Sequence, residues 1–257
     1  MINLLDTAEP KRLDSAIVDR GIIKSRERAK EAIKNGEIFV NGEQVKKPSE
    51  KVLAEDSIEF MGENLKYVGR GGLKLAKAID LCYINLKGKR CIDIGASTGG
   101  FTDCMLQNGA EKVWAVDVGH GQLAEKLRND SRVVNLEKTD IRNVTAETTE
   151  GRLDFAGTDV SFISLKFVLP EIYKLLKDDG EAVALIKPQF EAGKKNIGKN
   201  GIVKSEKVRL AVVEDIKNFA TATGFYVYET MESPIKGGSG NTEYLIYFGR
   251  KPRGNNL

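Results

Sequence analysis

The chain has 257 residues, of which 41% are hydrophobic and 30% are charged, and its formal net charge is +3. This length holds one large and one small domain, and the composition is ordinary for a globular protein. No apolar run approaches the roughly 20 residues of a membrane-spanning helix, and no apolar N-terminal region precedes a cleavage site. The sequence therefore argues against a membrane protein and predicts a cytoplasmic location.

The cysteines and the single histidine limit the chemistry that the chain can perform. Cys82, Cys91 and Cys104 show no C-x-x-C spacing, which argues against a zinc site or a disulfide framework and fits a reducing compartment. We predict no metal site. His120 is the only histidine and is expected at a pocket rim or on the surface, which disfavours a histidine-dependent triad.

Residues 10–62 predict a small α+β domain. Gly21 and Asn35-Gly36 are helix-end signals, Ser25 is a helix cap, and Asn41-Gly42 is a hairpin turn. The expected elements, in chain order, are a helix over 11–18, a helix over 26–34, a strand over 38–40, a return strand from 44–45 and a last strand over 56–60.

Basic side chains gather on the second helix of this domain. Arg26 and Lys30 lie one turn apart, and Lys24 and Arg28 extend the same surface. Such a surface suits a phosphate backbone. A solvated helix with ion pairs four residues apart fits the charge pattern equally well.

Residues 63–69 are predicted to be a linker, and residues 70–251 a larger domain. An amphipathic helix at 73–79 is followed by alternating strand and helix signals, which imply a mostly parallel, doubly wound α/β sheet. Strands are expected near 91–95, 112–117, 132–136, 153–159, 181–187, 225–231 and 243–248. Helices are expected near 100–108, 120–129, 164–177 and 204–223.

The stretch 91–102 predicts a buried strand, a tight glycine turn and a helix start. A dinucleotide turn needs a second glycine where Ser97 stands, and no G-K-[ST] for a nucleoside triphosphate is present. Asp117 ends the next strand, where a carboxylate can accept hydrogen bonds from ribose hydroxyls, and Asp140 follows the strand after it, where it could reach the adenine. These features predict an S-adenosylmethionine pocket, and a glycine turn in an unrelated α/β protein is the alternative.

Two further strand ends carry groups suited to catalysis. Asp159 begins Asp-Val-Ser-Phe rather than the Pro-Pro-aromatic sequence expected for methylation of a base amino group, and no cysteine nucleophile for cytosine carbon 5 lies nearby. Lys187 leaves an apolar strand, where partial desolvation favours its neutral form. A lysine that extends from a strand end to water is the alternative.

The small domain resembles the S-four RNA-binding module. The resemblance rests on Arg12-Leu13-Asp14, on Ser25-Arg26-x-Arg28-Ala29, and on Gly36-x-Ile38-x-Val40-Asn41-Gly42 with Pro48-Ser49. It implies RNA binding through shape and phosphate contacts, without base readout. The expected RNA-binding residues are Arg12, Lys24, Ser25, Arg26, Arg28, Lys30, Asn41 and, beyond the module, Arg70.

The whole chain resembles the TlyA family of haemolysin-A-like proteins, which join this module to an FtsJ-like methyltransferase. Its specific stretches are residues 69–75, 93–103, 115–123, 159–165, 187–191, 233–237 and 240–243. The family fold is Rossmann-like, with seven mostly parallel strands. Departures are His120 in place of a common tyrosine, Asp140 in place of an expected asparagine, and Lys66-Tyr67-Val68 in place of a tryptophan-bearing linker motif.

The resemblance implies 2′-O-methylation of cytidine in ribosomal RNA, with S-adenosylmethionine as cofactor and ribosomal subunits as partners. The implied catalytic tetrad is Lys74, Asp159, Lys187 and Glu243, in which Lys187 helps to remove the hydroxyl proton. The expected cofactor-binding residues are Asp93, Gly95, Ala96, Ser97, Thr98, Gly99, Phe101, Asp117, Val118, Asp140 and Asp159.

Three rival functions stay open at this point. A pseudouridine synthase also carries an S-four module, and Gly151-Arg152-Leu153-Asp154 superficially matches its catalytic loop. A membrane-active haemolysin is suggested by the family name, although no strongly amphipathic cationic helix supports it. An RNA-binding scaffold with an inert methyltransferase fold is the third, against which the complete tetrad argues. Nothing in the sequence indicates an oligomeric state.

Overall fold

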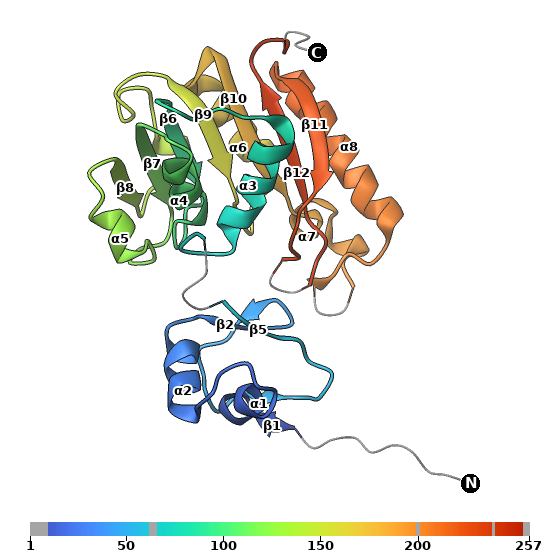
Figure 1. Cartoon of the computed structure of the whole chain (residues 1–257). Coiled ribbons are helices and arrows are strands. Elements are labelled where there is room, and N and C mark those ends of the chain that lie inside the picture. Colours follow the sequence, from blue (N-terminus) through green and yellow to red (C-terminus); the bar gives the residue numbers. More distant parts are fainter. Residues whose placement is uncertain (1–9, 62–65, 199–200, 238–239, 254–257) are drawn as a thin grey trace. The chain divides into compact units, whose positions relative to one another are not determined.

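A computed structural model describes residues 10–61, 66–198, 201–237 and 240–253 (Figure 1). The chain divides into two compact units, residues 1–65 with 236–240 and residues 66–235 with 241–257. Each unit is described by itself. The predicted linker spans the division in the chain at residue 65, but residues 62–65 lie outside the described residues, and the predicted domain boundaries remain predictions.

The N-terminal unit is a small α+β fold whose core is formed by Leu13, Ile17, Ile33 and Ile38, all fully buried. In chain order its elements are β1 (Lys11–Arg12), α1 (Leu13–Asp19), α2 (Arg26–Lys34), β2 (Ile38–Val40), β3 (Glu43–Gln44), β4 (Lys51–Val52) and β5 (Ile58–Phe60). β2 pairs antiparallel with both β3 and β5.

Two predicted boundaries in this unit differ from the structure by two residues, and both have local causes. The first helix begins at Leu13 and not at Lys11, because Lys11–Arg12 pairs with β4. The last strand begins at Ile58 because Asp56 is held in a turn, where it accepts hydrogen bonds from the Asn41 side chain and the Leu53 amide. The predicted cap is confirmed, since the Ser25 hydroxyl accepts a hydrogen bond from the Arg28 amide at 3.3 Å.

The large unit contains a seven-stranded sheet in the order β11-β12-β10-β9-β6-β7-β8. Its strands are β6 (Arg90–Ile94), β7 (Lys112–Asp117), β8 (Val133–Glu137), β9 (Leu153–Thr158), β10 (Leu176–Ile186), β11 (Tyr226–Glu232) and β12 (Tyr244–Gly249). β12 pairs antiparallel with both β10 and β11, and the other pairs of the sheet are parallel. The chain proceeds outward from β6 to β8 and then returns to place β9 on the other side of β6, so the strand order reverses there. The predicted mostly parallel sheet is confirmed.

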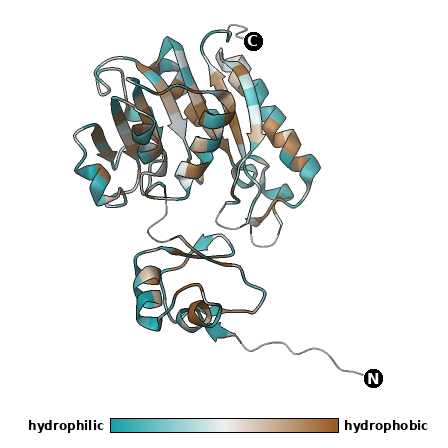
Figure 2. Cartoon of the chain, in the orientation of Figure 1, coloured by the Kyte–Doolittle hydropathy of each residue, from teal (hydrophilic) through white to brown (hydrophobic). Residues whose placement is uncertain are grey.

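Helices cover both faces of this sheet. They are α3 (Gly71–Cys82), α4 (Gly100–Gln107), α5 (Glu125–Arg128), α6 (Leu165–Leu175), α7 (Pro188–Glu191) and α8 (Glu206–Thr223), with 3₁₀ turns η1 (Ile141–Asn143) and η2 (Lys194–Asn196). Alternate strand residues enter two cores, one with α6 and α8 and the other with α3 and α4. Figure 2 shows the apolar and polar stretches that alternate along α8, as expected for a helix with one buried face.

The helix predicted over 120–129 is reduced to α5. Glu137 accounts for this difference, because its carboxylate accepts hydrogen bonds from the main-chain amides of Gln122 and Leu123 and so holds this segment as a loop. The Gln122 amide, followed by the Asn135 side chain, lowers the pKa of Glu137 to about 2.

Candidate active site

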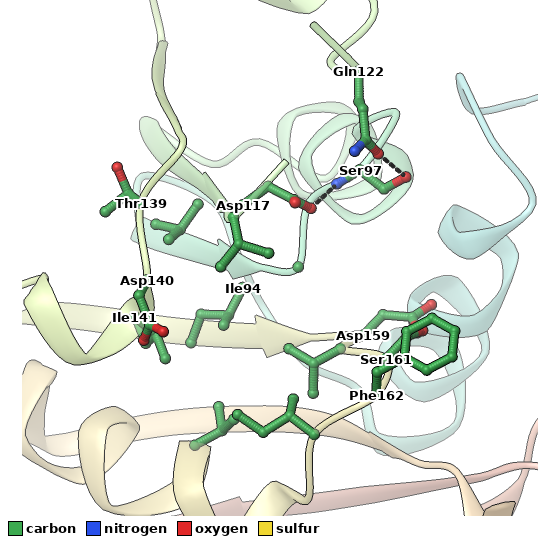
Figure 3. Close-up of a pocket in the computed structure, with 16 residues that line it drawn as sticks. Ile94, Ser97, Asp117, Gln122, Thr139, Asp140, Ile141, Asp159, Ser161 and Phe162 are labelled. Atoms are coloured by element: carbon green, nitrogen blue, oxygen red, sulfur yellow. Dashed lines mark hydrogen bonds between the residues drawn. The ribbon is translucent and has the colours of Figure 1, made fainter. Parts of the chain in front are cut away.

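Two pockets adjoin where the strand order reverses, at the carboxyl ends of β6, β7 and β9. They share Gly95, Ser97, Asp159 and Ser161. Figure 3 shows Asp117 and Ser97 on one side of the first pocket, and Asp159, Ser161 and Phe162 on another. The predicted cofactor residues that line one or both pockets are Asp93, Gly95, Ala96, Ser97, Thr98, Phe101, Asp117, Val118, Asp140 and Asp159.

Two positions of the turn require glycine, each for a different structural reason. Gly95 has a φ of +80°, and a Cβ on it would lie 3.0 Å from the main-chain oxygen of Asp159 and 3.2 Å from Val160 Cα. This glycine therefore lets β6 end against the loop that carries Asp159. Gly99, predicted to bind the cofactor, lines neither pocket. A Cβ there would collide with Leu123 and Leu127, so Gly99 makes room for the segment around α5.

Asp117 is held in place by the turn that it faces. Its Oδ2 accepts a hydrogen bond from the Ser97 amide at 2.8 Å, and its Oδ1 accepts one from the Gly119 amide at 2.7 Å. The Ser97 hydroxyl in turn donates to Gln122 Oε1 at 3.2 Å (Figure 3). A carboxylate oxygen can accept more than one hydrogen bond, so Asp117 is oriented and retains capacity for ligand hydroxyls.

Asp140 lines the pocket, but its carboxylate is already engaged. Arg142 donates to it through Nε at 2.9 Å and Nη2 at 2.6 Å, and the Arg142 amide donates at 2.9 Å. The Arg142 side chain is the main cause that lowers the pKa of Asp140 to about 2. A contact between Asp140 and adenine therefore stays a prediction.

Asp93 lines the second pocket and is 1% exposed. Its Oδ2 accepts hydrogen bonds from the amide and hydroxyl of Thr102 at 2.8 and 2.7 Å, and its Oδ1 has no partner among the described residues. Burial, against the effect of these bonds, raises the pKa of Asp93 to about 7.

The raised pKa of Asp93 predicts an unusual pH dependence of stability. Its ordinary pKa is 3.8, so the folded state binds more protons than the unfolded state between about pH 4 and 7, and the free energy of unfolding falls as pH rises through this window. The fall attributable to Asp93 is of order 4 kcal/mol. In urea unfolding at pH 4.5 and pH 8, the Asp93→Asn variant should lack this fall in the free energy of unfolding. An equal pH dependence in both proteins would contradict the assignment.

The four predicted catalytic residues come together from four separate elements. The Lys74 Nζ lies 2.9 Å from Glu243 Oε2 and 3.1 Å from Asp159 Oδ2. The Lys187 Nζ lies 2.6 Å from Asp159 Oδ1. Lys74 comes from α3, Asp159 follows β9, Lys187 follows β10, and Glu243 precedes β12.

Charges in this cluster stabilise one another. Burial of Lys74 opposes its charge, but Asp159 and Glu243 outweigh it and raise the pKa of Lys74. Burial also opposes ionisation of Asp159, but the two lysines outweigh it and lower the pKa of Asp159. The expected neutral form of Lys187 stays a prediction.

The structure adds three residues that sequence reasoning missed. Ser161 accepts a hydrogen bond from Lys187 Nζ at 2.8 Å. Phe162 is 91% exposed at a φ of +64°, and its ring lies 4.9 Å from that of Phe190. Glu191 accepts hydrogen bonds from the Ser164 hydroxyl at 2.6 Å and the Leu165 amide at 2.8 Å, which joins the loops that carry Asp159 and Lys187. The available signal for these three residues was their place in residues 159–165 and 187–191, two of the stretches that carry the family resemblance.

The predicted RNA-binding residues separate into two groups. Arg12 and Arg26 both donate to the buried carboxylate of Asp14, at 3.0 and 3.1 Å, and Asn41 holds the turn with Asp56 and Ser57. These three side chains have structural partners. Of the other predicted residues, Lys24, Ser25 and Arg28 are exposed, Lys30 is half-buried, and Arg70 is half-buried at the start of α3 in the other unit. Arg12 and Arg26 also keep side chains that are 42% and 53% exposed.

Comparisons with known proteins agree with this arrangement. Residues 67–250 match the model of the FtsJ-like methyltransferase family, and residues 11–58 match the S4 domain. The chain is 47% identical to the "Putative rRNA methyltransferase YqxC" of Bacillus subtilis, over 94% of this chain and 86% of that protein. It is 40% identical to the "16S/23S rRNA (cytidine-2'-O)-methyltransferase TlyA" of Mycobacterium tuberculosis, over 93% and 90%.

A solved structure shares both units of the fold. The "Putative hemolysin from Streptococcus thermophilus" is 46% identical, with a TM-score of 0.74 over 93% of this chain and 88% of that one. Within the described residues, no helix combines the length and the apolar character needed to cross a membrane. Together with the reversed strand order, the glycine turn and the four clustered charged residues, these matches show that the chain belongs to the TlyA, or haemolysin A, family of FtsJ-like methyltransferases.

Proposed function

We propose that this protein is an S-adenosylmethionine-dependent methyltransferase that modifies the 2′-hydroxyl of cytidine in ribosomal RNA. The observation that carries the proposal is the contact network of Lys74, Asp159, Lys187 and Glu243 beside a pocket at the reversal of strand order. Relatives named as rRNA methyltransferases support the substrate class.

The residues that line the pocket suit this cofactor. Asp117 is oriented to accept hydrogen bonds from ribose hydroxyls, and the unpartnered Oδ1 of Asp93 suits a ligand that brings a hydrogen-bond donor or a positive charge. Gly95 lines both pockets. When bound, the cofactor supplies a methyl group already activated by its sulfonium, so positioning of the acceptor provides much of the acceleration.

In the proposed mechanism Lys187 takes the proton of the attacking 2′-hydroxyl. Lys187 accepts this proton as the free amine and passes it to solvent after the methyl transfer. Lys74 and Lys187 share Asp159 as their partner. Asp159 and Ser161 then hold the neutral amine toward the substrate. Glu243 holds Lys74 through an ion pair, and the Gln189 side-chain amide donates a hydrogen bond to Glu243 at 3.5 Å.

Phe162 is placed to stack on the base of the target nucleotide. Its ring is exposed beside both Asp159 and the pocket, and the left-handed backbone conformation holds it there. Stacking of a base on an aromatic ring contributes about 1–3 kcal/mol, so Phe162→Ala should raise the KM for RNA about tenfold or more. Steady-state methyl transfer at varied RNA concentration measures this. Phe167→Ala, which removes another exposed ring, is the control, and equal KM values for the two variants would refute the assigned role.

One observation bears on the rival functions. Asp154, the candidate catalytic residue of a pseudouridine synthase, begins β9 and is bound by Lys177 Nζ at 2.7 Å and the Arg90 amide at 2.9 Å. It lies at the opposite end of β9 from Asp159, and its contacts are those of a structural residue. The rival function of a membrane-active haemolysin can be tested directly. Lysis of membranes by the purified protein without cofactor would favour that function.

The decisive experiment has two parts. Radiolabelled methyl transfer from S-adenosylmethionine to purified small and large ribosomal subunits should label RNA. Mapping of 2′-O-methyl groups in ribosomal RNA, with and without this protein, should show at least one cytidine whose modification depends on it. No labelling of either subunit, with calorimetry detecting no affinity for the cofactor, would overturn the proposal.

A further inference from the structure

A lysine-rich segment joins α7 to α8 and has not been assigned a role above. Residues 193–198 and 201–207, here called the basic strap, carry four lysines and one acidic residue, Glu206. The chain as a whole is nearly balanced, with 40 basic and 37 acidic residues, so the strap is a local excess of positive charge. Its lysines are all exposed, and they are Lys194, Lys195, Lys204 and Lys207.

The ammonium groups of these four lysines lack partners among the described residues. Several other lysines of the large unit form ion pairs with nearby carboxylates, as Lys174 does with Glu171 and Lys217 with Glu214. A surface of unpaired like charges raises the electrostatic energy of the folded protein. An anionic partner that covers this surface lowers that electrostatic energy.

The strap is held by the segment that carries the catalytic residue Glu243. The buried Asn241 donates to the Gly201 carbonyl and accepts from the Val203 amide, each at 3.0 Å. Arg209 donates to the Lys204 carbonyl at 2.8 Å and to the Tyr244 hydroxyl at 3.3 Å. The strap therefore begins six residues after Lys187 and is anchored by Asn241, two residues before Glu243.

We infer that the basic strap is a second RNA-contacting surface, which binds backbone phosphates beside the target nucleotide. This inference rests on the proposed function. Lysine ammonium groups on flexible stems act as point charges, without the planar fork that reads bases or pairs bidentately. The strap thus adds affinity and orientation at the methyltransferase site, and sequence selectivity comes from elsewhere.

The test compares two full-length variants that lose the same formal charge. The strap variant is Lys194→Gln, Lys195→Gln, Lys204→Gln and Lys207→Gln. The control variant is Lys87→Gln, Lys174→Gln, Lys177→Gln and Lys217→Gln. Lys87, Lys174 and Lys177 lie just before β6 or at the α6–β10 junction, at the end of the sheet opposite the active site. Affinity for ribosomal subunits is measured against salt concentration, alongside cofactor affinity and methyl transfer.

Each phosphate contact contributes about 0.7–0.9 to the slope of log affinity against log salt. The slope of log affinity against log salt should be smaller for the strap variant than for the wild type by about 3. Between about 50 and 200 mM salt, the affinity of the wild type should therefore fall about 60-fold further than that of the variant. Its KM for RNA should rise while kcat at saturating RNA and cofactor affinity stay unchanged. The double variants Lys194→Gln/Lys195→Gln and Lys204→Gln/Lys207→Gln should each show about half of the slope change.

Equal slopes for the strap and control variants would overturn the inference while wild-type methylation still supports the proposed function. Failure of the wild type to bind cofactor or methylate RNA would instead overturn the proposed function. Vesicles containing phosphatidylserine provide a further arm. Vesicle binding that the strap variant loses, with unchanged affinity for RNA, would assign the strap to lipid and overturn the inference.

Discussion

Replacement of Lys187 by alanine is expected to lower the rate of methyl transfer by about 10²–10⁴-fold, the usual contribution of a general base. Lys187 is 2.6 Å from Asp159 and 2.8 Å from Ser161, so the substitution removes the proposed proton acceptor and leaves Asp159 paired with Lys74. Affinity for the cofactor should be kept, because the turn at Gly95 and the carboxylate of Asp117 are unchanged. Single-turnover methyl transfer at saturating RNA, with calorimetry of cofactor binding, measures both quantities.

Lys187→Arg separates proton transfer from ion pairing. Arginine retains a cation beside Asp159 but does not lose its proton in proteins, so this variant should be as inactive as Lys187→Ala. Lys177→Ala, at the opposite end of β10, should be fully active. Turnover of Lys187→Arg near the wild-type level would show that Lys187 acts through its charge and not as a base.

Replacement of Lys74 by methionine is expected to cause the largest loss of stability. Glu243 is 2% exposed, and Lys74 is its only ion-pair partner among the described residues. Removing one member of a buried ion pair leaves the other charge uncompensated and typically costs about 3–5 kcal/mol. Urea unfolding at neutral pH should show a loss of this size.

A second substitution tests the cause of that loss. Lys74→Met combined with Glu243→Gln removes the isolated charge and should recover most of the stability without activity, whereas their effects would add if the sites were independent. A double variant that is less stable than Lys74→Met would show that lost packing, and not an unpaired carboxylate, accounts for the effect.

The sequence predicted every strand of the large sheet because apolar runs or alternating apolar residues between turn signals mark them, although β10 begins at Leu176 and not at Glu181. It also predicted which strand ends carry the site, since the carboxyl ends of parallel strands meet at one edge. It failed where a distant group decides local structure. Glu137 holds the segment before α5 as a loop. Asp14 engages Arg12 and Arg26, whose predicted contacts with RNA stay predictions. These contacts cannot be read from periodicity.

The contact of Lys187 with Ser161 could not be predicted for the same reason. The position of Lys187 at a strand end suggested desolvation, but its neighbours are Asp159, which follows the adjacent strand β9, and Ser161. Spacing also does not reveal the exposure of Phe162, which depends on a left-handed backbone conformation that residues other than glycine rarely adopt.

The position of β12 has a consequence for biosynthesis. This strand is the last of the sheet in sequence, yet it pairs with β10 on one side and β11 on the other. A nascent chain therefore exposes one open strand edge on β10 and another on β11 until residues 244–249 emerge, and open edges are prone to wrong pairing. Glu243 immediately precedes β12, so the ribosome must finish translating this segment before the enzyme that we propose acts on ribosomal RNA can become competent.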